Sequence, residues 1–527
     1  MKKRIISAAM AALMLLPTAT ALSGCRSNKA DIVLKVYSWE EYIDEGGEGS
    51  YVYDMLLEEG EDPSEDEAPA IIDDFQTWYE ETYGQSVRVE YSTFGTNEDM
   101  YNEIVLGNEY DLLCPSDYMI MKLAAENRIV PYDEEFFDAD NELNYYTRNV
   151  SPYINGVFEN GTVEVPDKET GKLTTHSWSE YAAGYMWGTT GFVYNPDPMG
   201  DGSVDVLAEL NDSEYSGWGA FTNPTFKNKI TTKDNVRDTY FAALGLTYQE
   251  ELLSLLQSAS YDNAELTKIF NRTEEQYIDE VYETLMNMKS NIYGFETDTG
   301  KADMVSGKIW LNYAWSGDAV YALDLAEDED DVELNYYVPE AGSNLWFDGW
   351  VMTSSVEERG TKQAAQAFVN FLSMPENAKR NSYYIGYTSV ISGEESEMLD
   401  YVDYLYGVED EEDETDENYY DLSYFFGTEA GIYADEDQRT CRQLYAQFPP
   451  EEVIERCAVM NYFDADTNER INELWSRVKA ETLDAWAIIV ICLTVAGIVL
   501  FVIFVKFGGK IDFFRRKPKK GYHKVDE

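Results

Sequence analysis

The segment from Asn344 to Trp350, Asn-Leu-Trp-Phe-Asp-Gly-Trp, places one carboxylate between two indole rings. An aromatic face attracts a cation by roughly 0.5–2 kcal/mol, and a neighbouring carboxylate adds a charge-assisted hydrogen bond. Asp348, with Trp346 and Trp350 on either side, therefore suits an organic cation. The same spacing is typical of core tryptophans on a strand, so both interpretations stay open at this point.

Groups that break bonds are scarce in this sequence. The chain has only two histidines, and a Ser-His-Asp or Cys-His arrangement outside the C-terminal tail would depend on His176 alone. There is no P-loop, no dinucleotide-binding glycine fingerprint and no zinc-ligand spacing. The 100 Asp and Glu residues leave catalysis by paired carboxylates open, but their abundance makes any one pair uninformative.

Length and charge narrow the class of protein further. A chain of 527 residues can form two or three domains with sizeable cores. The formal net charge of -61 would repel nucleic acid, so we expect no DNA or RNA partner. We also expect no cofactor and no metal site.

The N-terminus has the features of an export signal. Three basic residues at positions 2–4 precede an uncharged apolar stretch over residues 5–22. The stretch ends in Leu-Ser-Gly-Cys, which resembles the lipobox of bacterial lipoproteins. This resemblance implies that residues 1–25 form a lipoprotein signal and that the Cys25 thiol carries lipid. A signal anchor with a chance cysteine is the alternative.

The C-terminus has the features of a membrane anchor. Residues 485–505 contain no charged side chain, and at about 1.5 Å per residue they are long enough to cross a hydrocarbon core. A basic tail over residues 506–527 follows. The positive-inside rule places this tail in the cytoplasm and residues 26–484 outside, in agreement with an exported N-terminus.

Cysteine usage fits this placement. Cys492 lies in the predicted span, and Cys114 lies in an apolar run where a buried thiol is expected. Cys441 and Cys457 remain, both in the part predicted to be exported. They could form a disulfide, but their spacing alone does not decide whether they do.

Alternating strands and helices must position the candidate residues. We expect strands near 32–39, 87–91 and 110–116, with helices from 71 and from 96 between them. This order points to an α/β fold with parallel strands, in which ligands bind beyond the carboxyl ends of strands. The acidic stretch 44–69 is expected to be a surface insertion with limited structure.

The second half of the chain continues the pattern. We expect extended segments at 185–188 and 191–194, helices across about 237–290, and a strand over 308–315. The apolar spacing also predicts a helix near 362–372. The nearly continuous carboxylates of 409–417 indicate a solvated loop.

Three motifs in a fixed order resemble the spermidine/putrescine-binding proteins of polyamine ABC transporters. Tyr-Ser-Trp-Glu-Glu-Tyr occupies residues 37–42, Asp-Leu-Leu-Cys-Pro-Ser-Asp-Tyr occupies 111–118, and Trp-Phe-Asp occupies 346–348. The similarity runs from about Leu34 to Ala480, with interruptions at the acidic insertions. It implies a periplasmic-binding-protein fold, in which two α/β lobes joined by crossing strands close on a ligand without chemistry.

The resemblance also implies a set of ligand contacts. The positions that match the family motifs are Trp39, Tyr42, Ser116, Tyr118, Asp238, Trp315, Trp346, Asp348 and Tyr387. An alkyl polyamine is protonated at neutral pH, so its ends need acceptors and its methylene groups need apolar cover. Asp348 would bind one ammonium group, Trp346 and Trp315 would stack on the alkyl chain, and the tyrosines would supply ring faces and hydroxyls.

The sequence departs from the family at one carboxylate. Asn235 stands where the spermidine binder has an aspartate, and Asp238 stands where it has a glutamate. Glu40 replaces a neutral residue and would compensate if it faced the cleft. Glu40 and Asn235 could instead face solvent or cap a helix. The identity of the polyamine therefore stays open, and the family's late glutamine, near residues 461–462, is not aligned.

The predicted organisation follows from this alignment. Lobe 1 comprises residues 31–187 and 347–392, with an acidic insertion at about 45–70, and lobe 2 comprises residues 188–346 and 393–482, with an acidic loop at about 405–420. We expect a surface receptor that captures a polyamine and passes it to an ABC permease with a cytoplasmic ATPase. The alternatives are the same fold with another cation, a sugar or a metal chelate, and an exported carboxylate-dependent glycan hydrolase.

Overall fold

The computed structural model describes residues 30–480 apart from residues 65–66, 213, 331 and 394–395, and beyond them only Thr494. The predicted signal with Cys25, the predicted span 485–505 and the basic tail lie outside these residues, except for Thr494. Among the helices that the structure describes, none is both long and apolar enough to cross a membrane. Contacts divide the chain into a unit that ends at Leu474 and a second one that begins at Trp475.

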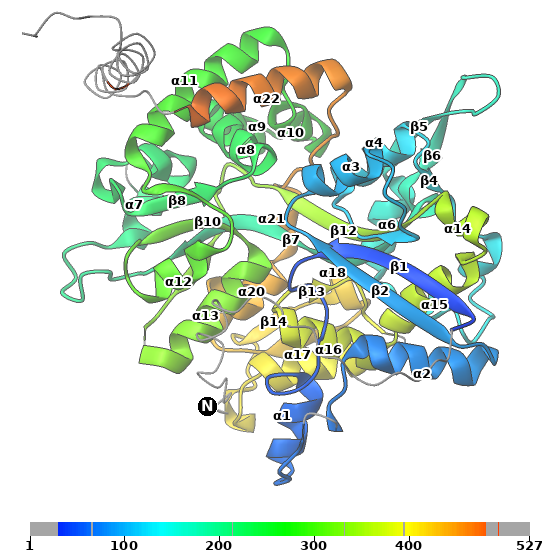
Figure 1. Ribbon diagram of the computed structural model, residues 1–527. Helices are drawn as coiled ribbons and strands as arrows, with labels where there is room; N and C mark the ends of the chain where they lie inside the picture. The colour runs from blue at the N-terminus through cyan, green and yellow to red at the C-terminus, as the bar shows by residue number, and fades with distance from the viewer. Residues whose placement is uncertain are drawn as a thin grey trace, which may run out of the picture. The chain divides into compact units, whose positions relative to one another are not determined.

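A large mixed sheet forms the centre of the first unit (Figure 1). Its strands are β1 (Ile32–Trp39), β2 (Val87–Phe94), β3 (Leu112–Leu113), β4 (Ile129–Val130), β7 (Ala182–Tyr194), β8 (Ile230–Lys233), β9 (Gly294–Glu296), β10 (Leu311–Trp315), β11 (Asn335–Tyr337), β12 (Leu345–Thr353) and β13 (Thr388–Ser389). Two small antiparallel sheets pair β5 (Thr162–Pro166) with β6 (Leu173–Ser177) and β14 (Tyr419–Asp421) with β15 (Gly431–Tyr433).

Two long strands, β7 and β12, join the two halves of the large sheet. The strand order is β2-β1-β3-β12-β7-β10-β8-β9, and the β1–β2, β1–β3, β8–β10 and β8–β9 pairs are parallel. Strand β7 pairs with β12 up to Thr189 and with β10 from Thr190 onward. The structure thus joins the two extended segments predicted at 185–188 and 191–194 into one fully buried strand.

Helices surround both halves of the sheet. Those before β7 are α1 (Tyr51–Glu58), α2 (Ile71–Tyr83), α3 (Asn97–Val105), α4 (Asp117–Ala125), α5 (Tyr145–Asn149) and α6 (Pro152–Asn160). Those between β7 and β11 are α7 (Val206–Asp212), α8 (Val236–Thr247), α9 (Gln249–Leu256), α10 (Asn263–Phe270), α11 (Glu275–Asn291), α12 (Thr299–Val305) and α13 (Ser316–Asp330).

The helices after β12 complete this arrangement. They are α14 (Ser355–Arg359), α15 (Lys362–Leu372), α16 (Pro375–Ile385), α17 (Glu397–Tyr406), α18 (Ser423–Phe426), α19 (Glu436–Thr440), α20 (Gln443–Gln447), α21 (Glu451–Glu455) and α22 (Ala465–Lys479). The 3-10 turns are η3 (Glu134–Phe137), η4 (Trp178–Glu180), η5 (Gly217–Thr222), η6 (Pro224–Phe226) and η7 (Glu411–Asp413).

Apolar periodicity explains how α2 and α15 pack against the sheet. Helix α15 spans the residues predicted for it and buries Phe368 and Phe371. The Phe75 ring of α2 lies 4.9 Å from the Phe368 ring, and the Trp350 ring of β12 lies 5.6 Å from it. Aromatic rings of this size dominate the burial of apolar surface, so this triad fixes the two helices on β12.

The acidic stretch 44–69 has more structure than its composition predicted. It contains α1, whose N-cap Ser50 accepts a hydrogen bond from the amide of Tyr53. The Tyr51 ring contacts Tyr383 of α16 and Tyr401 of α17 at centroid distances of 5.4 and 6.0 Å, and α1 lies beside these helices (Figure 1). The expectation of limited structure was wrong because a tyrosine inside the acidic run supplies an apolar anchor.

The cysteines are free thiols wherever the structure describes them. Cys114 is buried, as expected, and Cys441 and Cys457 do not pair. The Cys457 Sγ instead donates to the carbonyl of Val453. The structure thus answers the question of a disulfide that the spacing of Cys441 and Cys457 left open.

Candidate ligand-binding site

A β-bulge beside Asp348 sets the direction of its side chain. The register of β12 against β7 shifts there, so that Asp348 pairs with Met186 and Gly349 pairs with Gly184. The extra residue on β7 is Tyr185, whose hydroxyl donates to the carbonyl of Tyr42 at 2.8 Å. Bulges commonly redirect side chains next to functional sites. Trp350, beyond the bulge, is a core residue with 1% exposure.

Asp348 is buried without a cationic partner. Its Oδ2 accepts a hydrogen bond of 2.7 Å from the Tyr42 hydroxyl, and its Oδ1 is buried and accepts none from the described residues. No basic side chain in the described part of the chain forms an ion pair with it. Burial raises the pKa of Asp348 to about 6, although the Ser116 and Tyr42 hydroxyls act in the opposite direction.

Aromatic rings surround this carboxylate. The Tyr387 ring lies 5.3 Å from the Tyr42 ring and 5.7 Å from the Trp346 ring. The Trp346 indole nitrogen donates to the carbonyl of Thr189 at 3.1 Å, which fixes the plane of the indole. We refer to Tyr42, Trp346, Asp348 and Tyr387 as the Asp348 cluster. The structure brings these four predicted site residues together from β12, the β1–α1 loop and the α16–β13 loop.

A second carboxylate comes from the other half of the sheet. Asp238 lies in the first turn of α8 with 5% exposure, and its Oδ1 accepts a 3.3 Å hydrogen bond from the Trp315 indole. Burial raises the pKa of Asp238 to about 6, opposed by Lys233 and by the Trp315 hydrogen bond. The negative charge of Asp238 in turn raises the pKa of Asp348.

One face of Trp315 already carries a cation. The Lys233 Nζ lies 4.2 Å from the centroid of the Trp315 ring, within the range of a cation–π interaction. Lys233 is the last residue of β8 and Trp315 is the last residue of β10, so the carboxyl ends of two strands bring them together. Only the part of the Trp315 surface that Lys233 does not cover is therefore available for the predicted stacking on an alkyl chain.

Ser116 and Tyr118 form a polar group with two residues that the sequence did not indicate. The Asn97 amide donates to the Ser116 hydroxyl at 3.0 Å and to the Tyr118 hydroxyl at 3.1 Å. Tyr118 donates to Glu98 at 3.2 Å. The helix predicted from residue 96, which Thr96 caps by accepting from the Asp99 amide, has Asn97 and Glu98 in its first turn, but the sequence gave no sign of their role.

Three further predicted residues lie in different surroundings. Asn235 caps α8 by accepting a 2.7 Å hydrogen bond from the Arg237 amide, as one of the two interpretations predicted. Glu40 is exposed, and its side chain makes no hydrogen bond to a described residue. Trp39 packs against Phe94 at 4.7 Å, and its buried indole nitrogen has no partner among the described residues. Ligand contacts by these three residues stay predictions.

A buried ion-pair group beside Tyr387 was missed entirely. Asp318 accepts a 2.9 Å hydrogen bond from Lys233, lies 3.5 Å from the Lys301 Nζ, and accepts from the Tyr387 hydroxyl at 3.1 Å. Burial opposes the ionisation of Asp318, but Lys233 and Lys301 hold its pKa down at about 2. We refer to Asp318, Lys233 and Lys301 as the Asp318 cluster. The only sequence signal was a carboxylate just after the Trp315 strand.

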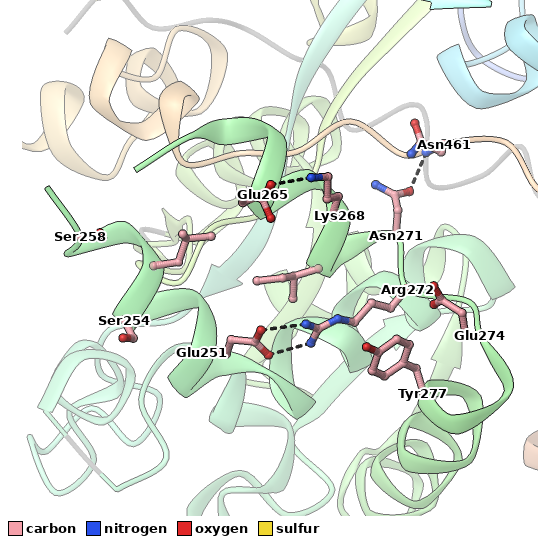
Figure 2. A pocket seen from close by; sticks show the side chains of 12 residues that line it. Glu251, Ser254, Ser258, Glu265, Lys268, Asn271, Arg272, Glu274, Tyr277 and Asn461 are labelled. Carbon is pink, nitrogen blue, oxygen red and sulfur yellow. Dashed lines mark hydrogen bonds and ion pairs between the residues drawn. The ribbon is translucent and has the colours of Figure 1, made fainter. Parts of the chain in front are cut away.

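A surface hollow between α9, α10 and α11 lies apart from these residues. Figure 2 shows Arg272 paired with Glu251 and Lys268 directed at Glu265 along its walls. Its two basic side chains are thus each paired with a carboxylate, and Glu274 accepts from the Thr273 amide. Asn461, close to the unaligned late glutamine position, lies at its edge and donates its amide to Asn271. The hollow contains none of the predicted site residues.

Comparison with known proteins gives a consistent result. Residues 70–397 match the family model described as bacterial extracellular solute-binding protein. The spermidine/putrescine-binding periplasmic protein of Salmonella typhimurium is 23% identical over 325 residues, which are 60% of this chain and 73% of that protein. The putrescine-binding periplasmic protein SpuD of Pseudomonas aeruginosa is 22% identical over 367 residues, or 69% and 80% of the two chains.

A solved structure agrees with these relatives. The crystal structure of the TpPotD lipoprotein of Treponema pallidum aligns with a TM-score of 0.50 and 15% identity, covering 85% of this chain and 99% of that one. At this identity the likeness concerns the fold. It confirms the predicted α/β fold of the periplasmic binding proteins.

Proposed function

Because this chain belongs to the family of bacterial extracellular solute-binding proteins, we propose that it captures a polyamine of the putrescine or spermidine class outside the cytoplasm. It delivers this ligand to the permease of an ABC transporter, whose cytoplasmic ATPase drives uptake. The relatives named for spermidine and putrescine binding support this reading. In this proposal the protein binds its ligand and catalyses no reaction.

The observation that carries the proposal is the state of Asp348. A buried carboxylate normally has a cation or several donors, because an uncompensated buried charge is costly. Asp348 accepts one hydrogen bond, from the Tyr42 hydroxyl, has the Ser116 hydroxyl nearby, keeps Oδ1 without a hydrogen bond from the described residues and has aromatic rings within reach. An alkylammonium group supplies both the missing positive charge and the missing hydrogen-bond donors, and its methylene groups match the rings.

The remaining predicted contacts complete the proposed site. Asp238 would receive the second ammonium group, with the exposed part of Trp315 covering the chain between the charges. Strands β7 and β12 would serve as the crossing strands between lobe 1 (residues 31–187 and 347–392) and lobe 2 (residues 188–346 and 393–482). Closure of these lobes on a ligand would bring Asp238 toward Asp348.

Membrane attachment belongs to the same proposal. Lipid on Cys25 and a helix over residues 485–505 would hold the receptor at the outer face, with the basic tail in the cytoplasm. Membrane fractionation of a Cys25→Ala variant tests the second anchor. The variant is expected to stay in the membrane fraction, and its complete release would contradict a spanning helix.

Titration calorimetry tests the function directly. The full-length protein in detergent, titrated with putrescine, spermidine and spermine in turn, is expected to give saturable heat with at least one of them. Choline, a permanently charged cation, and maltose, a sugar, serve as comparison ligands. Absence of saturable heat with all three amines from folded protein would refute the proposal, and saturation by maltose alone would favour a sugar receptor.

A further inference from the structure

Tyr42 of the Asp348 cluster lies in a loop, between β1 and the predicted acidic insertion. Its hydroxyl donates to Asp348 at 2.7 Å, and its carbonyl accepts from the Tyr185 hydroxyl at 2.8 Å. A side chain on a loop is placed less precisely than one on a strand or helix, unless the surrounding structure fixes the loop. The hydrogen bond to Asp348 therefore depends on what anchors the chain beside Tyr42.

Asp44, two residues further on, is such an anchor. It is fully buried, and its main chain and its carboxylate are both hydrogen-bonded. Its amide donates to the Asn381 side chain at 2.9 Å, and its carbonyl accepts from the Ile71 amide at 3.1 Å. Its carboxylate accepts from the Gly46 amide and from the Nε of Arg380, both at 2.8 Å. Asp44 thereby ties the loop to the first residue of α2 and to α16.

Arg380 of α16 holds both ends of the insertion at once. The residue is 8% exposed, and besides the bond from Nε to Asp44 it makes two more. Its Nη1 donates to Asp74 of α2 at 2.6 Å, and its Nη2 donates to the carbonyl of Pro69 at 2.7 Å. A guanidinium is planar and presents its donors in a rigid fork, so its three acceptors are held in one fixed arrangement.

The two ends of the insertion approach each other closely. The Gly47 amide donates to the carbonyl of Ala68 at 2.8 Å. Gly46 has a φ of +74°, and a Cβ atom there would lie 2.5–2.6 Å from backbone atoms of residues 68–70. Glycine is required because these backbone atoms cannot move aside as the end of a flexible side chain could. We refer to residues 44–47 and 68–71 as the neck of the insertion.

We propose that Arg380 is a positioning residue for ligand binding, which closes the neck and so holds the Tyr42 hydroxyl against Asp348. The inference rests on the proposed function and adds a residue that lies outside the family motifs. The hydrogen bonds of Arg380 go to the neck and to α2, so its effect on the ligand passes through Tyr42. When the neck opens, burial raises the pKa of Asp348 with less opposition, and less of the carboxylate is ionised at pH 7.

Calorimetry of full-length wild type and an Arg380→Gln variant with putrescine tests the proposal. At pH 7 the variant is expected to bind about fivefold more weakly, which is the loss expected from removing the Tyr42 hydroxyl itself. In a Tyr42→Phe background the same substitution should cost less than about twofold, because the hydrogen bond that Arg380 protects is already absent. The loss should also shrink at pH 8, where Asp348 is ionised in either protein. Losses that add, or that are equal at both pH values, would overturn the proposal.

Arg359→Gln is the matched control. Arg359 pairs with the fully buried Asp111 at 2.6 Å and donates to the carbonyl of Val33 at 2.7 Å, so it also ties a helix to the chain around β1. Val33 lies near the start of β1, whereas Tyr42 follows the end of this strand. The control is expected to lower the urea midpoint of unfolding, as Arg380→Gln does, and to leave putrescine affinity unchanged. An equal loss of affinity would show that the site responds to any lost arginine pair and would overturn the role of Arg380.

Two glycine variants cover the case in which Arg380→Gln does not fold. Gly46→Ala forces the neck open without removing a charge, and it is expected to weaken putrescine binding about threefold or more at pH 7. Gly49→Ala is its control, because Gly49 has a φ of +85° but a Cβ there would meet no heavy atom of the described chain within 4 Å beyond its immediate neighbours. It should leave affinity unchanged.

Wild-type affinity in Gly46→Ala, or an equal loss in Gly49→Ala, would contradict the positioning role of the neck while the proposed polyamine function stands. If wild type itself binds no amine, the proposed function and this inference both fall.

Discussion

Two buried aspartates, Asp348 and Asp318, lie on either side of Tyr387 in opposite electrostatic surroundings. Asp318 has Lys233 at 2.9 Å and Lys301 at 3.5 Å, whereas Asp348 has no cation among its described neighbours. Burial disfavours ionisation of both side chains. It prevails at Asp348, where the pKa rises to about 6, and it is outweighed by the lysines at Asp318, where the pKa falls to about 2.

The difference separates a carboxylate that stabilises the fold from one that is available to a ligand. When one partner of a buried ion pair is removed, the remaining charge stays buried without compensation. An unpaired buried carboxylate already destabilises the fold, and an added cation removes this penalty. Tyr387 connects the two, because its hydroxyl donates to Asp318 and its ring contacts Tyr42 and Trp346. The Asp318 cluster thus fixes the position of a ring in the Asp348 cluster.

The largest effect is expected from Asp318→Asn. The substitution leaves the buried Lys233 and the partly exposed Lys301 beside a neutral amide, with Glu296 at 3.8 Å from Lys233 as a remaining carboxylate, so the free energy of unfolding should fall by about 3 kcal/mol or more. Urea unfolding followed by tryptophan fluorescence measures the change. Asp303→Asn, which breaks the more exposed Lys308 pair, is the control and should cost less than about 1 kcal/mol. Equal losses in both variants would remove the distinction between the two aspartates.

Asp348→Asn is expected to have the opposite effect on stability and a large effect on binding. Without the carboxylate, putrescine affinity should fall about 100-fold or more, since a buried charged partner is worth about 2–5 kcal/mol. At pH 8 the ligand-free variant should be more stable than wild type, by on the order of 2 kcal/mol, because a raised folded pKa means that ionisation destabilises the fold.

Calorimetry and thermal unfolding of the same Asp348→Asn preparation check both parts. A variant that loses binding and also loses stability would show that Asp348 supports the fold, as Asp318 does. A variant that gains stability and still binds putrescine with wild-type affinity would place the ammonium site elsewhere.

The two aspartates should make the stability of the fold depend on pH in opposite directions. Asp348 has a folded pKa of about 6 against an unfolded value of about 3.9, so its contribution to stability is present below about pH 4 and is lost as the pH rises through 6. Asp318 has a folded pKa of about 2, so its contribution is present above about pH 4 and is lost as the pH falls through 2.

Of the two aspartates Asp348 and Asp318, only Asp348 should change ligand binding as it titrates. Putrescine needs the ionised form of Asp348 and, in the proposed site, of Asp238, so its affinity should rise at least about tenfold, and up to about 100-fold, from pH 5 to pH 7 and level off above. Calorimetry at pH 6 in two buffers of different ionisation enthalpy should show proton release on binding, with Asp238 adding to it. Proton uptake, or an affinity that falls with pH, would contradict the assignment of Asp348 as the ammonium acceptor.

The sequence predicted the fold and the residues around Asp348, but not those around Asp318. Strand alternation and helical apolar spacing located β1, α2, β2 and α15, because both depend on local patterns. The segment from Asn344 to Trp350 indicated Asp348 and Trp346 from residue types, and the resemblance to polyamine-binding proteins added Tyr42 and Tyr387. The Asp348 cluster was therefore predicted from one motif together with the family alignment.

The residues around Asp318 were not predicted. Lys233, Lys301 and Asp318 come from β8, α12 and α13, and nothing in their local sequence distinguishes a buried lysine from a surface one. Arg380 was missed for the same reason. Whether a charge is balanced is decided by contacts between segments far apart in the chain, which no single segment encodes.

The smallest expected effect concerns the single hydrogen bond between Tyr42 and Asp348. Tyr42→Phe removes the 2.7 Å hydrogen bond to Asp348 but keeps the ring contacts with Tyr185 and Tyr387. The pKa of Asp348 should then rise above about 6, and putrescine affinity at pH 7 should fall about fivefold, or about 1 kcal/mol. The loss should shrink at pH 8, where the carboxylate is ionised in either protein.

Tyr101→Phe is the control for this last change, because the Tyr101 hydroxyl also donates to a carboxylate, that of Glu126, but on the exposed surface of α3. It should leave affinity unchanged at both pH values. If Tyr42→Phe behaves like this surface control, the Tyr42 hydroxyl does not stabilise the ionised Asp348 carboxylate that binds the ligand. Burial would then raise the pKa of Asp348 without opposition from Tyr42, and the contrast with Asp318 would depend mainly on the presence or absence of lysines.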